Sequence, residues 1–277
     1  MGKTHLRFLA LRRIFIRPLQ ITVDSMALNV ICLATYAVEF VRVGGTLMKH
    51  KKAGGWAGAT VAVEYDEEQK DQIREAADIL GIDVHFLDLP RGNVWPTVEA
   101  KKKVVRVLRE NRPDIVIMED PESVWLPGDP DRVACYEIYR DSISHAARPS
   151  FAPEQIDEGL KTHTVKAIYY PSFNNPDCVV DITGFYAKKR KAEDALRFQI
   201  VYGLESWREQ VPETVFRSLV PDYERVKKDP YELGRSVREI MQNARTILQG
   251  TRGRTALGET FRRELKMSVY TFDQLPI

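Results

Sequence analysis

The chain has 277 residues, of which 44% are hydrophobic and 29% charged, and its formal net charge is +2. This composition is typical of a folded globular protein and excludes a disordered chain. No apolar run approaches the roughly 18 residues that a membrane span needs. The 41 basic and 39 acidic residues leave no charge excess that would predict nucleic acid as a partner. We therefore expect a soluble protein with one main domain and with neither nucleic acid nor a membrane as partner.

Two features of the chain bear on where the protein resides. Residues 1–25 mix basic with apolar residues but lack the apolar core and cleavage site of a secretion signal. We interpret them as an N-terminal extension or the product of an upstream start codon, and we expect residues 26–277 to fold as a single domain. Cys32, Cys135 and Cys178 lie far apart without Cys-x-x-Cys spacing, which suits a reducing cytoplasm and predicts buried thiols.

Apolar patterns predict strands and helices in alternation. Helical spacing of apolar residues, with Gly81 and Pro113 as stop signals and Thr97 as an N-cap, distinguishes the helices from the short apolar strands. Strands are predicted over residues 30–34, 59–64, 82–86, 114–118 and 165–170, and helices over residues 39–53, 67–80, 98–111, 133–147, 181–202 and 231–248. This order predicts an α/β fold, a Rossmann-like, mostly parallel sheet with helices on both faces. A ligand site is expected beyond the carboxyl ends of the strands.

Two of these helices have an apolar side that we expect to be buried. In the helix over residues 98–111 it includes Val98, Val104, Val105 and Leu108. In the helix over residues 231–248 it forms a longer stripe, made of Leu233, Val237, Ile240, Met241, Ala244 and Ile247.

Six motifs follow one another along residues 28–265 in the order and spacing of a known family. The first is Val30 to Glu39 followed by Gly44-Gly45-Thr46-Leu47. The others are Ala76 to Gly81 with Phe86 to Pro90, Arg112 to Val116, Asp129 to Arg132, Val180 to Thr183 with Lys189 and Gln199, and Glu259 to Arg262. Together they resemble the motifs of the LmbE/PIG-L family of zinc-dependent N-acetyl-sugar deacetylases, which opens with A-H-P-D-D-E and G-G-T-L. The resemblance implies that family's α/β fold.

The family's reaction is a metal-assisted amide hydrolysis, in which three protein ligands hold zinc and leave one position for water. The resemblance implies that the zinc ligands fall at Thr35, Val38 and Arg132, and that the general base falls at Ala37. Valine and alanine offer no lone pair, a lone threonine hydroxyl is a poor ligand, and arginine is a permanent cation. The sequence therefore predicts that zinc is absent and that deacetylase activity is lost.

Residues around the implied metal site also differ from those of the family. Asp129 stands at the position of the family's transition-state histidine, and Gln69 and Gln72 stand at its Arg-x-x-Glu pair. Arg91 stands at the position of a family aspartate, and Arg42 at that of a glycine. Of the acidic residues in the opening motif, Glu39 is retained. Because the family's ligands must meet at a single metal, the resemblance also implies that the carboxyl end of the first strand and residues 129–132 meet at one concave site.

An acidic group near the end of a predicted strand allows two interpretations. It consists of Glu119, Asp120, Glu122, Asp129 and Asp131. These carboxylates could hold an oxygen-ligated Mg²⁺ or Ca²⁺. We favour the alternative, in which they pair with Arg132 and Arg91 or cap helices. The five histidines have no spacing that would place two ligands on one helical face.

The leading hypothesis is a catalytically inactive binding or assembly module, working as a homo-oligomer or beside an active relative. The alternatives are a hydrolase of N-acetyl sugars with an altered metal site, and a protein that binds a sugar or an anionic small molecule in the former active site. The candidate pocket residues are Thr35, Glu39, Arg42, Arg91, Asp129, Asp131 and Arg132. Arg132 either pairs with acidic side chains and closes the pocket or, with Arg42 and Arg91, holds an anion. Trp95 and Trp125 either line the pocket rim or pack, which we favour.

Overall fold

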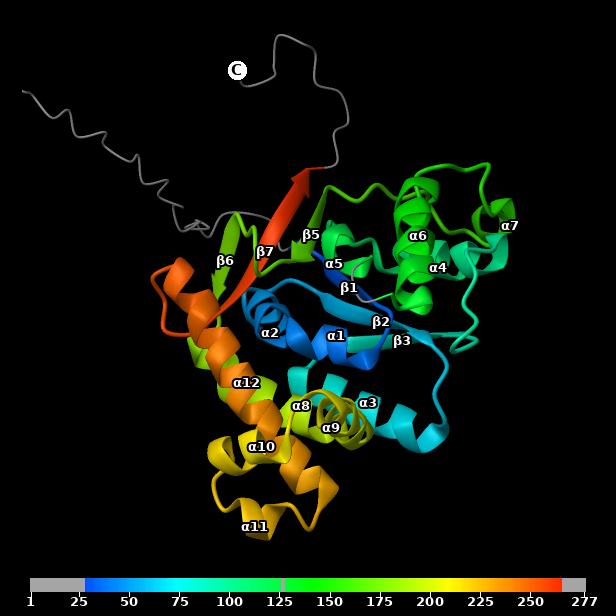
Figure 1. Ribbon diagram of the computed structural model, residues 1–277. Coiled ribbons are helices and arrows are strands. Elements are labelled where there is room, and N and C mark those ends of the chain that lie inside the picture. Colours follow the sequence, from blue (N-terminus) through cyan, green and yellow to red (C-terminus); the bar gives the residue numbers. More distant parts are fainter. Residues whose placement is uncertain (1–27, 126–127, 266–277) are drawn as a thin grey trace, which may run out of the picture.

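The structure, a computed structural model, describes residues 28–125 and 128–265 (Figure 1). Its sheet has the strand order β3-β2-β1-β4-β5-β7-β6. The strands are β1 (Val30–Ala34), β2 (Ala57–Val63), β3 (Asp83–Leu89), β4 (Ile115–Met118), β5 (Ala167–Pro171), β6 (Cys178–Asp181) and β7 (Gly258–Leu265). The strands from β3 to β5 pair in parallel, and β7 runs antiparallel to both β5 and β6. The predicted α/β fold with a mostly parallel sheet is confirmed.

Helices cover both faces of this sheet (Figure 1). They are α1 (Ala37–Arg42), α2 (Gly44–Lys52), α3 (Glu67–Leu80), α4 (Val98–Asn111), α5 (Pro121–Val124), α6 (Pro130–His145), α7 (Pro153–Asp157), the 3-10 turn η1 (Thr183–Phe185), α8 (Tyr186–Ala195), α9 (Arg197–Gln210), α10 (Glu213–Leu219), α11 (Tyr223–Val226) and α12 (Pro230–Arg252). In Figure 1, α4 and α6 lie on one face, and α1, α2, α3 and α8 lie on the other.

Local sequence signals set several of these boundaries. The Asp66 side chain accepts a hydrogen bond of 2.8 Å from the Gln69 backbone N–H at the start of α3, and Gly81 ends the helix with a φ of 72°. Such a left-handed C-cap favours glycine. The Thr97 side chain accepts from the Ala100 N–H at 3.2 Å and caps α4, as predicted.

Two helices predicted as continuous are interrupted. The segment predicted as a helix over residues 39–53 divides into α1 and α2 at Val43. The segment over residues 181–202 begins with the end of β6 and a 3-10 turn, and then divides into α8 and α9 at Leu196. In the first case the break frees the N–H groups of Gly45 and Thr46, which donate to the Glu259 carboxylate at 3.0 and 2.8 Å. A distant residue thus stabilises a helix start that apolar spacing does not indicate.

The expected apolar faces are only partly buried. Val98, at the start of α4, is 57% exposed, whereas Val104, Val105 and Leu108 are buried. In α12 the expectation fails in the second half of the helix, because Met241 and Ile247 are each 48% exposed and Ala244 is exposed as well. The buried part of the stripe consists of Leu233 and Val237, which are buried, and Ile240, which is half-buried.

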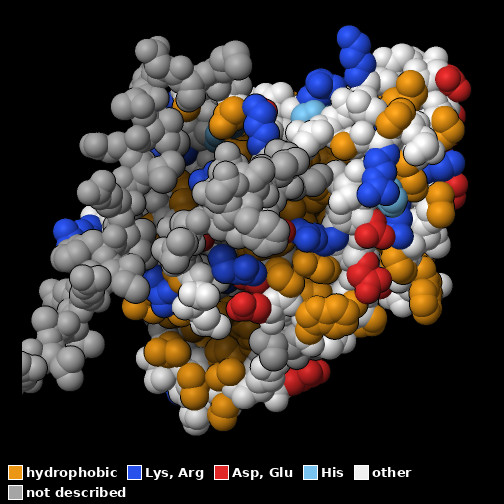
Figure 2. All heavy atoms as spheres, turned by 90° about the horizontal axis from the view of Figure 1, so that it is seen from above, with side chains coloured by type: hydrophobic (Ala, Val, Ile, Leu, Met, Phe, Trp, Pro, Cys, Tyr) orange, Lys and Arg blue, Asp and Glu red, His pale blue; other side chains and the backbone are white. Residues whose placement is uncertain are grey.

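The main core surrounds the sheet, whose strands β1 and β2 are buried along their whole lengths. A second apolar cluster joins α9, α10 and α11 to the first half of α12. On the face seen in Figure 2, basic and acidic side chains are interspersed, in agreement with the small net charge. Within the described residues, no helix is long and apolar enough to cross a membrane. The predicted extension over residues 1–25 lies outside the described residues.

Candidate functional site

The candidate site lies at the carboxyl ends of β1 and β4, where the segments flagged by the sequence meet. Buried Glu39, in α1, links them. One of its carboxylate oxygens accepts the Thr35 backbone N–H at 2.7 Å, and the other lies 2.9 Å from Nη1 of Arg132 at the start of α6. The end of the first strand and residues 129–132 therefore meet at one carboxylate, as the motif order predicts.

Arg132 is surrounded by carboxylates. Its Nη1 contacts Glu39 and Glu119, its Nε lies 3.2 Å from Asp129, and its side chain is only 18% exposed. Burial disfavours the charged guanidinium, but Glu39, Glu119 and Asp129 outweigh this effect and raise the pKa of Arg132. Its guanidinium also lies 4.9 Å from the centre of the Tyr36 ring. Arg132 is therefore a fixed positive charge at the centre of the site.

The site holds more carboxylates than this one cation can neutralise. Burial, followed by repulsion from Glu119, raises the pKa of Glu39 to about 8, although Arg132 and Arg42 act in the opposite direction. Burial and Asp129 likewise raise the pKa of Tyr36, whose hydroxyl donates to Asp129 at 3.3 Å. The neighbouring phenol is therefore held in its neutral form.

The other acidic residues of the predicted group cap chain segments or form ion pairs. Asp129 accepts the backbone N–H groups of Asp131 and Arg132 at the start of α6. Asp131 accepts those of Gly92 and Val94 at 2.6 and 3.2 Å. Asp120 caps α5 and forms an ion pair of 2.8 Å with Arg262, and Glu122 is exposed. These contacts support the pairing and capping interpretation rather than an Mg²⁺ or Ca²⁺ site.

The remaining predicted pocket arginines have weaker acidic contacts. Arg91 does not form the expected ion pair with this acidic group within the described residues. Its guanidinium instead lies 5.7 Å and 5.1 Å from the ring centres of Tyr36 and Tyr65. Arg42 reaches Glu119 only at 3.8 Å, and that carboxylate already binds Arg132.

The residues at the positions where the resemblance implies zinc ligands and the general base do not fit a metal. Buried Ala37 and half-buried Val38 supply only hydrocarbon side chains, and Thr35 supplies a single hydroxyl. Arg132 contacts Glu39, the nearby carboxylate that could have helped to hold a cation. Within residues 28–125 and 128–265, no three His, Cys, Asp or Glu side chains are grouped so as to hold a metal ion. We therefore derive no chemical step through zinc.

The two tryptophans considered for the pocket rim are not packed in the core. Trp95 is 68% exposed and Trp125 is 60% exposed. The favoured prediction that they pack is wrong. The Trp95 indole N–H donates to the Asn93 side chain at 2.9 Å, so its polar edge has a local partner in the loop before α4.

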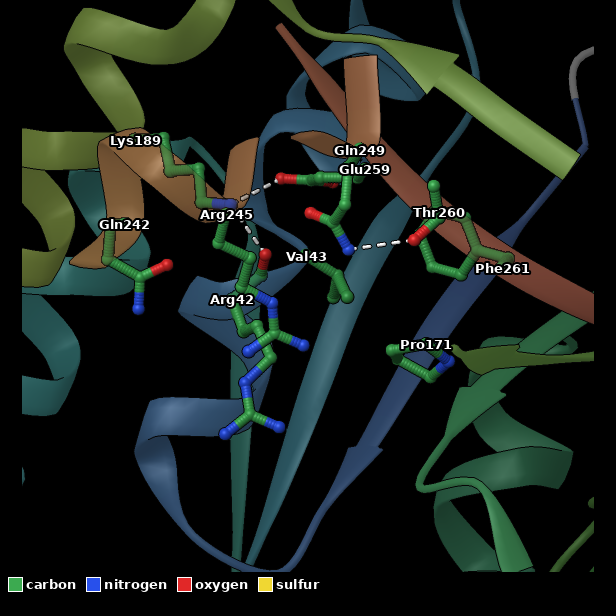
Figure 3. Close-up of a pocket in the computed structure, with 10 residues that line it drawn as sticks. All are labelled: Arg42, Val43, Pro171, Lys189, Gln242, Arg245, Gln249, Glu259, Thr260 and Phe261. Atoms are coloured by element: carbon green, nitrogen blue, oxygen red, sulfur yellow. Dashed lines mark hydrogen bonds and ion pairs between the residues drawn. The ribbon is translucent and has the colours of Figure 1, made fainter. Parts of the chain in front are cut away.

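A second, basic cavity lies beside this site and shares Arg42 with it (Figure 3). We call it the basic cavity, and the side chains that define its chemistry are Arg42, Lys189, Gln242, Arg245, Gln249 and Glu259. Of the pocket residues predicted from the sequence, Arg42 lines this cavity. The others, from α8, α12 and β7, were missed, although polar residues at 238, 242, 245 and 249 recur at helical spacing along one side of α12.

A salt bridge orders one wall of the basic cavity. Buried Lys189 lies 2.7 Å from Glu259 and donates at 2.6 Å to the Arg42 backbone carbonyl. Glu259 in turn accepts the N–H groups that begin α2 and the Thr46 hydroxyl. Three of the sequence motifs, at residues 44–47, 189 and 259–262, therefore meet here and connect α2, α8 and β7.

Comparison with known proteins agrees with the fold and the motifs. Residues 39–143 match the PIG-L family, GlcNAc-PI de-N-acetylase. The chain is 32% identical over 142 residues to diacetylchitobiose deacetylase from Thermococcus kodakarensis, covering 50% of this chain and 51% of that protein. It is 38% identical over 56 residues to 1D-myo-inositol 2-acetamido-2-deoxy-alpha-D-glucopyranoside deacetylase 2 from Frankia casuarinae, covering 20% of this chain and 17% of that protein. The matched region thus spans about half or less of these relatives.

Solved structures share the architecture at lower sequence identity. N,N'-diacetylchitobiose deacetylase from Pyrococcus horikoshii superposes with a TM-score of 0.64 at 19% identity, covering 89% of this chain and 88% of that one. GalB, the 4-carboxy-2-hydroxymuconate hydratase from Pseudomonas putida, superposes with a TM-score of 0.61 at 15% identity, covering 88% and 99%. At these identities the likeness concerns the fold.

Proposed function

Because this chain carries a PIG-L/LmbE family domain, we propose that it is a non-hydrolytic member of the family, a binding module whose former metal site is closed by an arginine. The observation that carries this proposal is the position of Arg132 among Glu39, Glu119 and Asp129. A guanidinium supplies fixed positive charge and hydrogen-bond donors, but it has no open coordination position at which water could be activated.

The surrounding residues supply no replacement for the lost chemistry. A general base must lie within reach of the water it deprotonates and must be free to accept a proton. Glu39 has the raised pKa of a candidate base, yet its two oxygens already accept the Thr35 N–H and contact Arg132. A hydrolase with an altered metal site is the alternative proposal, but no contact at this site favours it over the closed pocket.

The fold by itself does not decide the activity. The structures that it resembles include deacetylases and also a hydratase, so the same architecture accommodates different reactions. The relatives that match in sequence are named for acetylated sugar substrates, which supports a sugar or a related small molecule as the ligand of this chain. Assembly with a second copy or with an active relative remains part of the proposal. We also propose a reducing cytoplasm, since all three cysteines are free.

Metal analysis and an activity assay test this function together. We expect the full chain, purified without chelator, to hold far less than one zinc per molecule and to release no acetate from diacetylchitobiose. Stoichiometric zinc together with hydrolysis that a chelator abolishes would show that the proposal is wrong.

A rebuilt site provides the positive control. The combined variant Thr35→His, Ala37→Asp, Val38→Asp and Arg132→His restores the side chains that the family resemblance implies at these positions. We expect this variant to bind zinc in near-stoichiometric amount, because three ligands then converge on one position. Arg132→His alone should not bind zinc, since the positions at 35 and 38 still lack imidazole and carboxylate.

A further inference from the structure

The second half of α12 places its polar side toward the protein and its apolar side toward solvent. Gln242, Arg245 and Gln249 line the basic cavity. Arg238 lies about two helical turns before Arg245, on the same side of α12. Met241, Ile247 and Leu248 are about half exposed on the other side. Burying arginines while exposing apolar residues is unfavourable by itself, so the inward-facing arginines call for a compensating interaction.

The acidic residues around the basic cavity are already paired with other cations. Glu259 binds Lys189, Glu193 lies 2.5 Å from Arg190, and Oδ2 of Asp194 lies 3.1 Å from Arg235, whereas Oδ1 of Asp194 is buried without a hydrogen-bond partner. Among the residues that the structure describes, no ion pair links Arg238 or Arg245 to a carboxylate, and Nη1 of Arg238 is buried without a hydrogen-bond partner. Two partly buried guanidinium groups therefore lack an ion pair, and only more distant carboxylates, Glu193 among them, act on their charge.

Arg42 adds to this excess of positive charge. In Figure 3 its guanidinium lies next to that of Arg245, and both point into the basic cavity. Burial and then the charge of Arg42 lower the pKa of Arg245 to about 10, against the opposing effect of Glu193 and Glu259. Burial also lowers the pKa of Arg238, where Glu193 opposes the shift and Arg42 and Arg190 add to it. Like charges held together under burial are the electrostatic arrangement that an anion relieves.

We propose that the basic cavity binds a small phosphate-type oxyanion between Arg42 and Arg245, with the Gln242 amide as a further donor. Guanidinium groups present paired N–H donors that match such oxygens two at a time. The cavity has room for little more than one water molecule, so the two arginine side chains must move apart to admit a free anion or the phosphate group of a larger molecule that extends toward solvent. This inference rests on the proposed function and names a ligand class for the non-hydrolytic module. It assigns anion binding to Arg42 and Arg245 rather than to the predicted set of Arg132, Arg42 and Arg91.

The shared residue Arg42 connects this anion site to the closed metal site. Its Nη1 lies 3.8 Å from Glu119, which is bonded to Arg132. An anion bound to Arg42 would compete with this weak contact and leave the stronger pairing of Arg132 unchanged. The two sites therefore differ in role, one closed by internal carboxylates and the other open to an external anion.

Calorimetry and thermal unfolding of the full chain, with inorganic phosphate as the ligand, test the anion site. The same measurements with glucose 6-phosphate and with glucose show whether the site takes a phosphate group carried by a sugar. We expect phosphate to bind and to raise the Tm of the wild-type protein. Arg245→Gln should weaken phosphate binding by on the order of tenfold or more, because it removes a charge-assisted fork. The same variant should unfold at a higher temperature than the wild type in phosphate-free buffer, since an uncompensated buried charge is gone.

The matched control is Arg208→Gln, which removes an exposed arginine of α9 that does not line the cavity. It should leave phosphate binding and the phosphate-dependent change in Tm as in the wild type. No phosphate binding to the wild type, or equal binding by wild type and Arg245→Gln, would overturn the anion site. Either result leaves the proposed lack of hydrolysis standing, because that proposal is overturned only by zinc and acetate release.

Discussion

At the scale of single residues, Arg132 stands where the family resemblance implies a metal ligand, and its ion pairs form the centre of the site. Zinc in a deacetylase carries positive charge and keeps a position for water, whereas Arg132 carries positive charge and binds three carboxylates. Arg132 therefore offsets part of the negative charge of Glu39 and Glu119. The same side chain stabilises the acidic residues around it.

We expect Arg132→Met to lower the free energy of unfolding by about 3–5 kcal/mol, because it leaves buried carboxylates without their cation. The loss should grow from about pH 6 to about pH 9. Burial and Glu119 hold the pKa of Glu39 above its unfolded value, so its contribution to stability is present at low pH and is lost as the pH rises through about 8. Without Arg132 this carboxyl binds its proton more tightly still, and its ionisation at high pH is less favourable.

Urea denaturation at the two pH values measures this effect. Arg106→Met is the control, because it breaks an exposed ion pair with Glu158 and should change stability little. A small, pH-independent loss in Arg132→Met would indicate that the Arg132 pairing contributes nothing to stability.

At the scale of elements, the start of α2 shows how a distant strand fixes a helix boundary. Glu259 of β7 accepts the N–H groups of Gly45 and Thr46 and binds Lys189 of α8. The close approach requires glycine, since a Cβ on Gly45 would lie 2.7 Å from the Ile182 side chain and 2.8 Å from the Glu259 carboxylate. The second glycine of the motif at residues 44–47 is thus a packing requirement for this junction.

Gly45→Ala is expected to cost about 1–3 kcal/mol of stability, because the added methyl group overpacks the junction and displaces the Glu259 carboxylate. Gly203→Ala is the matched control: it lies within α9 with open space around its Cβ position, and alanine there should stabilise by about 0.5–1 kcal/mol. Thermal unfolding compares the two variants. Equal effects of the two substitutions would contradict the packing argument.

At the scale of the whole molecule, the described residues by themselves complete the centre of the sheet. β1 pairs with β2 on one side and β4 on the other, and both β1 and β2 are buried throughout. The first strand therefore needs no partner from residues 1–25 to satisfy its backbone. That the folded unit begins near residue 26 stays a prediction.

Deleting residues 1–25 is expected to lower Tm by less than about 2 °C, which corresponds to less than about 1 kcal/mol for a domain of this size. Calorimetric unfolding of the truncated and full chains measures the difference. A large decrease in Tm would identify the segment as an integral element of the fold rather than an extension.

The sequence by itself determined the α/β alternation, most strand and helix positions in the first half, and the side-chain chemistry at residues 35, 37, 38 and 132, where the family resemblance implies zinc ligands and a general base. These properties depend on local periodicity, on capping residues such as Asp66 and Thr97, and on side-chain functional groups, all of which can be read from neighbouring positions. Their determinants lie within a few residues of the feature that they control.

Only the tertiary structure decided the pairing of Arg132, the split between α1 and α2, and the polar inward side of α12. Each depends on contacts between residues far apart in the chain, such as Gly45 and Glu259, which are separated by 214 positions. The helical spacing of Met241, Ala244 and Ile247 predicts a buried stripe, but spacing does not say which side of a helix meets the protein. That choice depends on what α12 packs against, and here its neighbours are Lys189, Glu259 and the basic cavity rather than an apolar surface.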